Sequence, residues 1–500
     1  MTAADPPTRD PETGAETFTS TQPATGDVVG THAVHGEADV AAAVARARTA
    51  AAEWEGLGFD GRGRALAAWR KLIARRASDL AEVVHAETGK PRADAWLEVL
   101  LTLDHLAWAT RHAPKVLGRQ RVSPGMLMAN HAATIEYLPL GVVGVIGPWN
   151  YPVFTPMGSI AYALAAGNAV VFKPSEHTPG VGEWLGQSAA EAMELPGLLE
   201  VVTGFGPTGS ALVASGVDKL AFTGSAATGR KVMAAAAATL TPVVMECGGK
   251  DAVIVDVDAD LDAAADATVW GAMANAGQTC TGVERVYAHA DVYDELVEKV
   301  VAIAKDVRPG IDPEADIGPM TMPSQLDVVR RHVADAVARG GRALLGGVDA
   351  VDDRYAQPTV LVDVPEDSSA VTEETFGPTV TIARVDSIDE AVERANATGY
   401  GLGATVFSKA NGDEIARRLR TGMVSVNSVI SFAAIPALPF GGVGESGFGR
   451  IHGPDGLREM TRPQAVARQR MRAPVALTSF RRTKATDAMV RRIVRRLHGG

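Results

Sequence analysis

Short runs of β-branched residues alternate with Ala-rich segments over most of the chain, and this alternation restricts the possible folds more than any other feature. In a first series, the pattern predicts strands at 168–176, 199–204 and 219–225 and helices at 157–166, 180–192 and 209–214. Strands that are apolar on both faces and alternate with helices are typical of a parallel sheet covered by helices on both sides. The pattern therefore predicts an α/β fold.

A second series of the same kind begins at Asp251. Its strands are predicted at 251–255, 283–287, 358–364, 380–384, 404–407 and 423–426. Because 500 residues are too many for one hydrophobic core, we expect two α/β domains in succession. Ala-rich helices are predicted ahead of both series, starting at Asp39 and recurring at 61–86 and 92–112.

The composition argues against several classes of protein. With 48 basic and 59 acidic residues, the net charge of −11 argues against nucleic acid as a partner. The 2 cysteines cannot form a disulfide framework, and their scarcity fits a reducing compartment. No metal site is expected, because the chain contains no CxxC motif and its histidines are scattered.

The N-terminal residues predict neither a signal peptide nor a folded segment. Residues 1–18 are rich in Pro, Thr and acidic residues and lack an apolar core region, so we expect them to be disordered. The longest apolar stretches, at 141–147 and 160–172, are interrupted before they reach membrane-spanning length. A cytoplasmic protein is therefore predicted.

The C-terminus carries a charge opposite to that of the rest of the chain. From Arg468 onward there are ten Lys or Arg residues and one Asp, a charge of +9, which leaves −20 for the remainder. Within 488–497, four apolar residues fall at i, i+3, i+4 and i+7: Val490, Ile493, Val494 and Leu497. This spacing predicts a short basic amphipathic helix. Such a helix can lie on an anionic membrane or fold onto the acidic body of its own or a neighbouring subunit, and both interpretations stay open.

In parallel sheets, ligands bind at the carboxyl ends of the strands. Here those ends are predicted at 149–150, 173–176 and 223–225. At the second strand end, Lys173 and Glu176 offer a donor and an acceptor beyond a buried strand. They could bind the ribose of adenosine, or they could belong to an ordinary solvated loop. In the third, Ser225 begins a helix, where free N–H groups favour a phosphate or where the serine simply caps the helix.

Residues 204–209, G-F-G-P-T-G, match the GxGxxG pattern of dinucleotide-binding proteins. That motif also requires an acidic residue about 20 positions later, and the segment 226–233 contains none. The match is interpreted as a Gly-rich turn.

Two short segments contain candidate catalytic residues. Cys280 lies in A-N-A-G-Q-T-C-T-G, a polar and flexible setting in which a thiol is accessible as a nucleophile, although a structural cysteine is an equal alternative. Glu246 lies in M-E-C-G-G-K between an apolar run and two glycines, where partial desolvation would make it a general base; the alternative is a carboxylate at a loop tip. Cys247 is interpreted as buried packing.

Taken in order, these segments resemble the NAD(P)-dependent aldehyde dehydrogenase superfamily. The resemblance extends from about residue 18 to about residue 465. Within the superfamily, the chain is similar to bacterial proteins labelled succinate-semialdehyde dehydrogenase. The resemblance is carried by P-W-N at 148–150, K-P-S-E at 173–176, F-T-G-S at 222–225, M-E-C-G-G-K at 245–250, G-Q-T-C at 277–280, E-T-F-G-P at 374–378 and P-F-G-G-V-G-E-S-G-F-G-R at 439–450. Two departures are Cys247, where the family often has Leu, and the basic tail.

The resemblance implies a domain organisation. A Rossmann-type cofactor-binding domain would comprise 19–118 and 140–248, and an α/β catalytic domain would comprise 249–447. A small β oligomerisation arm would comprise 119–139 and 460–472, followed by the basic tail at 473–500. The arm implies a homodimer or homotetramer.

The resemblance also implies a reaction. Cys280 would attack an aldehyde to form a thiohemiacetal and then a thioester, with Asn150 and the Cys280 N–H stabilising the oxyanion. Glu246 would activate the water that hydrolyses the thioester. In CoA-acylating relatives, CoA takes the acyl group instead, and a Glu at this position is generally missing, which counts against that alternative.

The implied cofactor is NAD, with NADP possible but less preferred, because the Glu176 carboxylate repels a 2′-phosphate and Lys173 softens the repulsion. Glu374 would hold the nicotinamide ribose and Phe376 would flank the ring. The cofactor-binding set is Ile146, Pro148, Trp149, Lys173, Ser175, Glu176, Gly206, Gly224, Ser225, Glu374 and Phe376.

The residues that match the family's substrate pocket are mostly aromatic: Tyr151, Phe154, Thr281, Phe432 and Phe440. No Arg occurs between Asn150 and Ala161, where relatives specific for succinate semialdehyde often carry one. An apolar or aromatic aldehyde is therefore predicted in preference to succinate semialdehyde.

Overall fold

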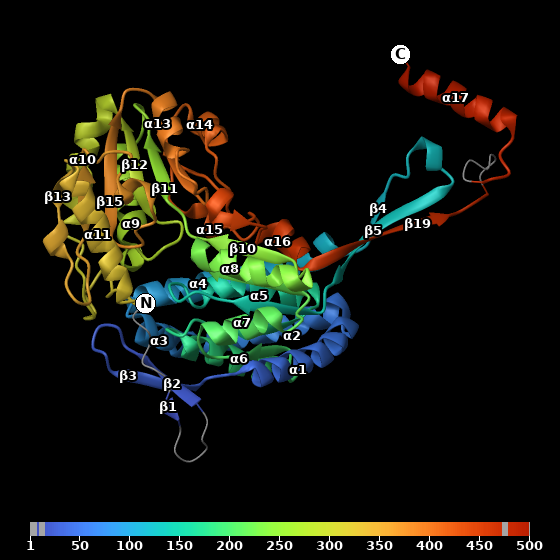
Figure 1. Cartoon of the computed structure of the whole chain (residues 1–500), viewed down its shortest axis with the longest axis horizontal. Helices are drawn as coiled ribbons and strands as arrows, with labels where there is room; N and C mark the ends of the chain where they lie inside the picture. The colour runs from blue at the N-terminus through green and yellow to red at the C-terminus, as the bar shows by residue number, and fades with distance from the viewer. Residues whose placement is uncertain (1–7, 10–15, 473–478, 500) are drawn as a thin grey trace. The chain divides into compact units, whose positions relative to one another are not determined.

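The computed structural model describes residues 8–9, 16–472 and 479–499 (Figure 1). The chain divides into two compact units. The first comprises Met1–Val116 and Pro139–Thr461, and the second comprises Leu117–Leu138 and Arg462–Gly500.

The first unit begins with a small antiparallel sheet and four helices. Their bounds are β1 (Thr8–Arg9), β2 (Glu16–Thr21), β3 (Val28–Ala33), α1 (Glu37–Gly56), α2 (Gly58–Arg75), α3 (Ala77–Thr88) and α4 (Arg92–Leu117). The expected disorder of residues 1–18 is wrong for residues 8–9 and 16–18, where Thr8 pairs with Thr17. Phe18 holds this segment, because its buried ring packs 5.0 Å from that of Phe205. Residues 1–7 and 10–15 lie outside the described residues.

The first large sheet has six strands in the order β18-β10-β9-β6-β7-β8. Their bounds are β6 (Val142–Ile146), β7 (Ala169–Lys173), β8 (Leu199–Val201), β9 (Lys219–Gly224), β10 (Val243–Cys247) and β18 (Gly447–Phe448). All neighbours are parallel except the β10–β18 pair. The strand order reverses at β6, which pairs with both β7 and β9, and ligands bind beside the carboxyl ends of strands at such a switch point.

Helices cover this sheet. Their bounds are α5 (Phe154–Ala166), α6 (Pro179–Met193), α7 (Gly206–Ala214) and α8 (Ala226–Ala236). Helices α1, α5 and α7 each contact both β6 and β7, and α8 contacts β9 and β10. The strands and helices predicted for this series are confirmed, with ends shifted by a few residues.

The second large sheet has seven strands in the order β13-β14-β15-β12-β11-β16-β17. Their bounds are β11 (Asp251–Val255), β12 (Val283–His289), β13 (Arg342–Leu345), β14 (Thr359–Val362), β15 (Thr379–Val385), β16 (Ala404–Phe407) and β17 (Ser425–Val426). Only β13, which pairs antiparallel with β14, was not predicted. It is a short edge strand with mostly exposed side chains and therefore lacks an apolar signal.

Both faces of the second sheet are buried, as the apolar strands predict. Along β11, Val253 and Val255 belong to one apolar cluster and Ala252 and Ile254 to another. The first cluster includes residues of α9 (Leu261–Met273) and α10 (Ala290–Ala304), and the second includes residues of α13 (Ile388–Ala395) and α14 (Gly412–Arg418). Figure 1 shows these two pairs of helices on opposite sides of β11 and β12. An α/β architecture with two mainly parallel sheets is thus confirmed.

One further long helix, α11, and several short elements complete the first unit. They are η2 (Ala237–Thr239), η3 (Ala274–Gly277), α11 (Ser324–Ala338), η4 (Val348–Ala350), α12 (Ser369–Thr372), α15 (Ser431–Ala434), η5 (Gly444–Ser446) and α16 (Gly453–Glu459).

The second unit contains a three-stranded sheet in the order β19-β5-β4, which we call the arm, and a C-terminal helix. Its elements are β4 (Gln120–Val122), η1 (Met126–Met128), β5 (His131–Pro139), β19 (Thr461–Gln469) and α17 (Lys484–His498). The helix predicted around 488–497 is confirmed, and the Thr483 hydroxyl caps it by accepting from the Thr486 N–H at 3.3 Å. Among the described residues, no helix combines the length and hydropathy needed to cross a bilayer.

Candidate active site

Cys280 follows a tightly held loop between α9 and β12. Asn275 and Ala276 have positive φ angles of 53° and 56°. The loop is held by the Asn275 side chain, whose Nδ2 donates to the Asn150 carbonyl at 3.0 Å and to the Gln278 carbonyl at 3.2 Å. Gly277 packs against the Gly377 backbone so closely that any side chain there would overlap the carbonyl group. These contacts place the segment 277–280 beside the end of β6.

Asn150 reaches this loop from the carboxyl end of β6. Its Nδ2 donates to the Gln278 carbonyl at 2.9 Å, and the second N–H of the amide remains available to a ligand. Its own carbonyl accepts from Lys90 Nζ at 2.7 Å. Asn150 is therefore held through its side-chain amide at Gln278 and through its backbone carbonyl at Lys90.

Lys90 and Glu98 form a buried support for Asn150 that the sequence did not reveal. Their side chains form an ion pair at 2.8 Å and are 1% and 0% exposed. Glu98 Oε1 also accepts from the N–H groups of Val153 at 2.7 Å and Phe154 at 3.0 Å, at the start of α5. The contacts of Lys90 with Asn150 and of Glu98 with Val153 and Phe154 span 55 to 60 residues, so no local pattern indicates them.

Cys280 and Glu246 line one small, largely enclosed cavity. The cavity is mainly apolar and is lined by Phe154, Thr155, Thr223, Glu246, Cys247, Cys280, Phe440, Ile451 and His452. In a shared cavity, a thiol can attack a carbonyl carbon as nucleophile, and a carboxylate can then act as base on a water molecule that attacks the same carbon.

Glu246 lies near the end of β10 and is 4% exposed. Neither of its carboxylate oxygens has a hydrogen-bond partner. Burial raises its pKa well above the usual value, and the charge of Arg450 opposes this only in part. An unpartnered carboxylate with a raised pKa is suited to accept a proton from a water molecule.

The surroundings of the Cys280 thiol disfavour its ionisation. Burial raises its pKa, as do the negative charges of Glu374, Asp251 and Glu246, whereas the Thr281 N–H lowers it. Burial also raises the pKa of Cys247 to about 12. Cys247 is 4% exposed, which agrees with its interpretation as packing.

The two glycines after Cys247 allow other groups to approach the backbone. A side chain on Gly248 would overlap the Glu374 carboxylate, and one on Gly249 would lie 2.5 Å from the Cys280 carbonyl oxygen. Glu374 Oε1 accepts from the Gly249 N–H at 3.0 Å. Burial and the nearby Glu284 charge raise the pKa of Glu374 to about 8.

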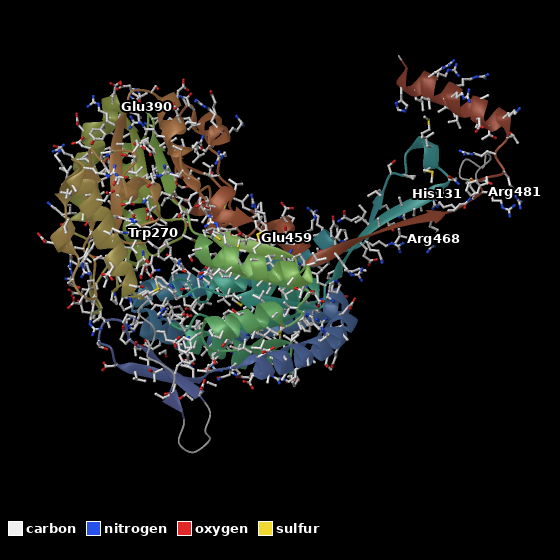
Figure 2. All side chains as sticks on the ribbon, viewed as in Figure 1. His131, Trp270, Glu390, Glu459, Arg468 and Arg481 are labelled. Atoms are coloured by element: carbon white, nitrogen blue, oxygen red, sulfur yellow. The ribbon has the colours of Figure 1, made fainter. Side chains whose placement is uncertain are left out.

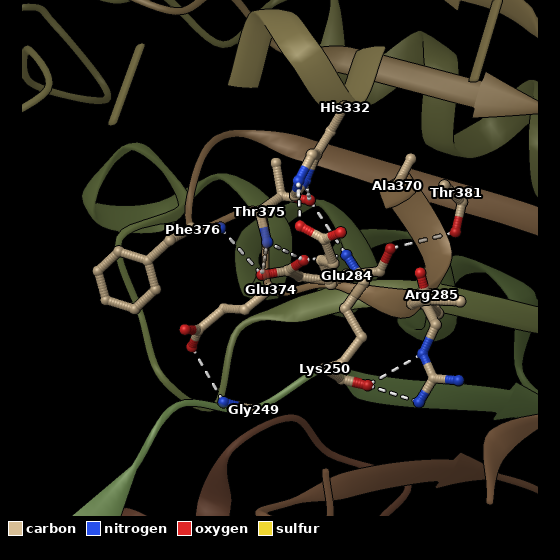
Figure 3. Close-up of polar contacts among 12 residues, drawn as sticks. Gly249, Lys250, Glu284, Arg285, His332, Ala370, Glu374, Thr375, Phe376 and Thr381 are labelled. Atoms are coloured by element: carbon tan, nitrogen blue, oxygen red, sulfur yellow. Dashed lines mark hydrogen bonds and ion pairs between the residues drawn. The ribbon is translucent and has the colours of Figure 1, made fainter. Parts of the chain in front are cut away.

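A second buried network, also missed from sequence, holds the segment 374–376 (Figure 3). Glu284 forms an ion pair with Lys250 and accepts from the N–H groups of Thr375 at 2.8 Å and Phe376 at 3.0 Å. Lys250 also donates to Thr375 Oγ1 at 3.1 Å. Glu374 and Phe376 are therefore positioned from the side of the second sheet.

Trp149 connects the two sheets at the predicted cofactor site. Its ring lies 5.6 Å from that of Phe376 and 6.4 Å from that of His177, edge to face in both cases. Lys173 Nζ lies 3.9 Å from Glu176 Oε2 and donates to the Pro174 carbonyl at 3.0 Å. Burial lowers the pKa of Lys173.

The remaining predicted cofactor residues lie at the same edge of the first sheet. Gly206 begins α7 and has open space around it, and Ser225 caps α8, accepting from the Thr228 N–H at 3.3 Å. The others lie at or just after strand ends: Ile146, Pro148, Ser175 and Gly224. Two helix N-termini, the open space at Gly206 and the partly exposed Glu176 carboxylate fit a dinucleotide.

The predicted pocket residues are only partly brought together. Phe154 and Phe440 line the cavity, and the Phe432 ring packs 6.4 Å from that of Phe440. Tyr151 does not line it, because its hydroxyl pairs with Thr279 Oγ1 at 3.0 Å and its ring lies 4.2 Å from Lys90 Nζ. Thr281 is buried and does not line it either.

Comparisons with known proteins agree with this geometry. The model of the aldehyde dehydrogenase family matches residues 10–466, so the chain belongs to this family of NAD(P)-dependent oxidoreductases. It is 36% identical to 4,4'-diapolycopene aldehyde oxidase of Methylomonas sp, over 92% of this chain and 87% of that protein. It is 37% identical to a putative succinate-semialdehyde dehydrogenase [NADP(+)] of Mycolicibacterium smegmatis, over 91% and 90%. Its fold matches the crystal structure of an NAD-dependent aldehyde dehydrogenase from Sinorhizobium meliloti with a TM-score of 0.88 and 35% identity, over 92% and 93%.

The histidines, cysteines and carboxylates of the described residues contain no group of three or more that could hold a metal ion.

Proposed function

We propose that the protein oxidises an aldehyde to a carboxylic acid with NAD, through covalent intermediates on Cys280. The single observation that carries the proposal is the cavity shared by the Cys280 thiol and the unpartnered Glu246 carboxylate. In the overall reaction, the aldehyde and water lose two electrons and two protons to give the acid. NAD accepts a hydride when bound, and the other proton goes to solvent.

The chain's own residues account for the remaining chemistry. The Cys280 thiol gives up its proton, which passes to solvent, as Sγ adds to the carbonyl carbon. The second N–H of the Asn150 amide and the Cys280 N–H stabilise the resulting oxyanion, each by about 2.7–4 kcal/mol. After loss of hydride, the acyl group remains on Sγ as a thioester. Glu246 takes a proton from water, which attacks the thioester and releases the acid and the thiol. The presence of Glu246 argues against transfer to CoA instead.

NAD is favoured over NADP. In the binding mode we propose, Lys173 and Glu176 hold the adenosine ribose, Gly224 and Ser225 lie at the pyrophosphate, and Glu374 and Phe376 lie at the nicotinamide end. The Glu176 carboxylate accepts both ribose hydroxyls but repels a 2′-phosphate, and Lys173 at 3.9 Å weakens that repulsion. The relatives do not agree on the cofactor, since their names give NADP in one case and NAD in another.

The substrate is an apolar or aromatic aldehyde. Phe154, Phe440 and Ile451 line the cavity, and the described residues that line it include no Lys or Arg. A substrate carboxylate would therefore be buried without a countercharge. This argues against succinate semialdehyde, despite the names of several relatives.

A panel of aldehydes tests these proposals. We expect kcat/KM for hexanal, benzaldehyde or a long-chain aldehyde to exceed that for succinate semialdehyde at least tenfold, because the latter must bury its carboxylate (a cost of roughly 1.4 kcal/mol or more). NADH absorbance measures each rate, and repeating the series with NADP gives the cofactor preference. The reverse order of substrates would mean that a cation enters the pocket, and equal values for NAD and NADP would contradict the role of Glu176.

We also propose a domain organisation and an oligomer. We assign 19–118 and 140–248 to a cofactor-binding domain and 249–447 to a catalytic domain, each built around one of the two large sheets. The arm would assemble a homodimer or homotetramer. Eight of the nine residues of β19 are exposed, and an open edge strand is a template for pairing with another chain.

We also propose a cytoplasmic location with peripheral membrane contact through α17. None of its side chains is buried, and Val494 and Leu497 are 53% and 46% exposed. The basic side chains of the helix are Lys484, Arg491, Arg492, Arg495 and Arg496. Figure 2 shows nitrogen-tipped side chains along this helix.

An anionic membrane satisfies both faces of α17 at once. The apolar residues enter the interface while the arginines reach the lipid phosphates, each cation contributing about 1 kcal/mol. Docking on the acidic body would satisfy one face and leave the other exposed.

Vesicle co-sedimentation tests the membrane contact. The full chain should pellet with anionic vesicles at low salt, remain in the supernatant with neutral vesicles, and be released by high salt, because the attraction is electrostatic. A chain that ends at Thr478 should stay in the supernatant throughout. If the full chain also stays in the supernatant with anionic vesicles at low salt, the tail does not bind membranes.

A further inference from the structure

Two buried histidines lie beside the catalytic cavity and are not used by the reaction described above. His452 lines the cavity, is 1% exposed, and has no hydrogen-bond partner on either ring nitrogen. The ring of His105 lies 4.0 Å from that of His452. His105 is also 1% exposed; its Nε2 lies 3.1 Å from the Ala433 carbonyl oxygen and its Nδ1 has no partner. The pair thus carries three unpartnered nitrogens.

The fold holds His452 in place despite an unfavourable backbone. Its φ of 60° and ψ of 165° belong to a region that glycine almost alone adopts. The preceding residue, Ile451, exchanges backbone hydrogen bonds with Phe440 at 2.7 and 2.9 Å, which fixes the chain on one side. Gly158 of α5 leaves the room that the imidazole needs, because a Cβ there would lie 2.6 Å from Nε2.

The surroundings of His452 are aromatic, and its burial disfavours the protonated form. Its ring lies 5.5 Å from that of Phe440, 5.6 Å from that of Phe154 and 5.7 Å from that of Tyr162. The Tyr162 hydroxyl is already committed to the Pro436 carbonyl at 3.2 Å. Burial and the neighbouring His105 lower the pKa of His452 well below the usual value, and burial lowers that of His105 to about 4.

A neutral imidazole offers one donor and one acceptor. Buried polar groups in proteins are nearly always hydrogen-bonded, and one left without a partner destabilises the fold. An unpartnered imidazole beside a substrate cavity therefore points to a ligand that completes it.

We propose that His452 hydrogen-bonds a neutral oxygen substituent of the substrate, such as a hydroxyl, ether or keto oxygen distant from the aldehyde. The substrate class is then a mainly apolar aldehyde that carries one such oxygen. This inference rests on the proposed aldehyde oxidation and narrows its substrate. A carboxylate is disfavoured, because a neutral imidazole provides no charge to offset its burial.

Pairs of substrates that differ only in one polar atom test the inference. We would measure kcat/KM with NAD for 3-hydroxybenzaldehyde against 3-methylbenzaldehyde, and for 4-hydroxybenzaldehyde against 4-methylbenzaldehyde. Hydroxyl and methyl are similar in size, and their electronic effects on the aldehyde are the same for every enzyme variant. The hydroxyl-to-methyl ratio in the wild type, divided by the same ratio in a variant, therefore isolates the contact with the protein.

In His452→Phe, the hydroxyl-to-methyl ratio of kcat/KM should be roughly 3- to 10-fold lower than in the wild type for at least one of the two pairs, as expected for the loss of one hydrogen bond. The methyl substrates should still be oxidised, which shows that the variant is folded and catalytic. His452→Asn provides a second variant, because Asn tolerates a positive φ while its shorter side chain withdraws the polar group; its ratio should fall as well. Tyr162→Phe is the matched control in the same cluster, and its ratio should equal that of the wild type.

An unchanged ratio in both His452 variants would overturn the inference while leaving the proposed oxidation intact. If the wild type oxidises none of these aldehydes with NAD or NADP, the proposed function itself fails. The two failures are therefore distinguishable.

Discussion

Cys280→Ala is expected to abolish NAD reduction by aldehydes. The substitution removes the partly exposed thiol two residues after Gln278, whose carbonyl holds the Asn150 amide, so the covalent intermediate cannot form. The loss of steady-state activity should be at least about 10³-fold, comparable with removal of the nucleophile in other covalent enzymes. NADH absorbance measures the rate, and calorimetric titration with NAD should give an unchanged affinity.

Cys247→Ala is the matched control, because it removes the other thiol of the same cavity. The raised pKa of Cys247, about 12, keeps that thiol neutral at ordinary pH, and the structure gives it no catalytic contact. The variant should retain most of the wild-type rate. Activity that survives in Cys280→Ala and disappears in Cys247→Ala would reverse the assignment.

Glu246→Gln is expected to separate the two halves of the reaction. The amide keeps the shape of the carboxylate but cannot take a proton from water, so hydride transfer proceeds once and the thioester then persists. Rapid mixing should show a burst of about one NADH per Cys280, followed by a steady-state rate lower by roughly 10²–10⁴-fold. Mass spectrometry of the stalled enzyme should find the acyl group on Cys280. Turnover at the wild-type rate would exclude Glu246 as the base.

The pH dependence of kcat provides a second test of Glu246 as the base. Because burial raises the pKa of Glu246, the base form is lost as the pH falls through a value well above that of an ordinary glutamate. The wild-type kcat should therefore decline on the acidic side at an unusually high pH, and this limb should be missing from Glu246→Gln. Glu445→Gln, which neutralises a half-exposed surface carboxylate paired with Arg230, should keep the wild-type profile.

Much of the fold is predictable from sequence because its signals are local. The strands at 251–255 and 404–407 are predicted to the residue, since each is a short apolar run between polar ends. The first helices are predicted less well: the single stretch at 61–86 is two helices, α2 and α3, interrupted at Arg76. The edge strand β13 and the N-terminal strands β1 and β2 carry too few apolar residues to be recognised.

The active site likewise contains residues that can be recognised from sequence and residues that cannot. The residues that do the proposed chemistry, Cys280, Glu246 and Asn150, lie in short motifs and are recognisable in the chain itself. The groups that position them are not, because Lys90, Glu98 and Glu284 bind backbone groups that lie 55 to 92 residues away in the sequence. A lysine or glutamate in a helix or strand looks the same in sequence whether it faces water or a buried partner.

By itself, the sequence determined the class of fold, the family and the identities of the reacting groups, since these depend on periodicity and on motifs a few residues long. Only the tertiary structure decided which side chains share the cavity. It placed Tyr151 and Thr281 outside the lining and brought in Thr155, Ile451 and His452. Packing also left Glu246 and His452 buried without partners, and thereby set the direction of their pKa shifts. The physical reason is that desolvation depends on the atoms surrounding a group in space, most of which come from distant parts of the chain.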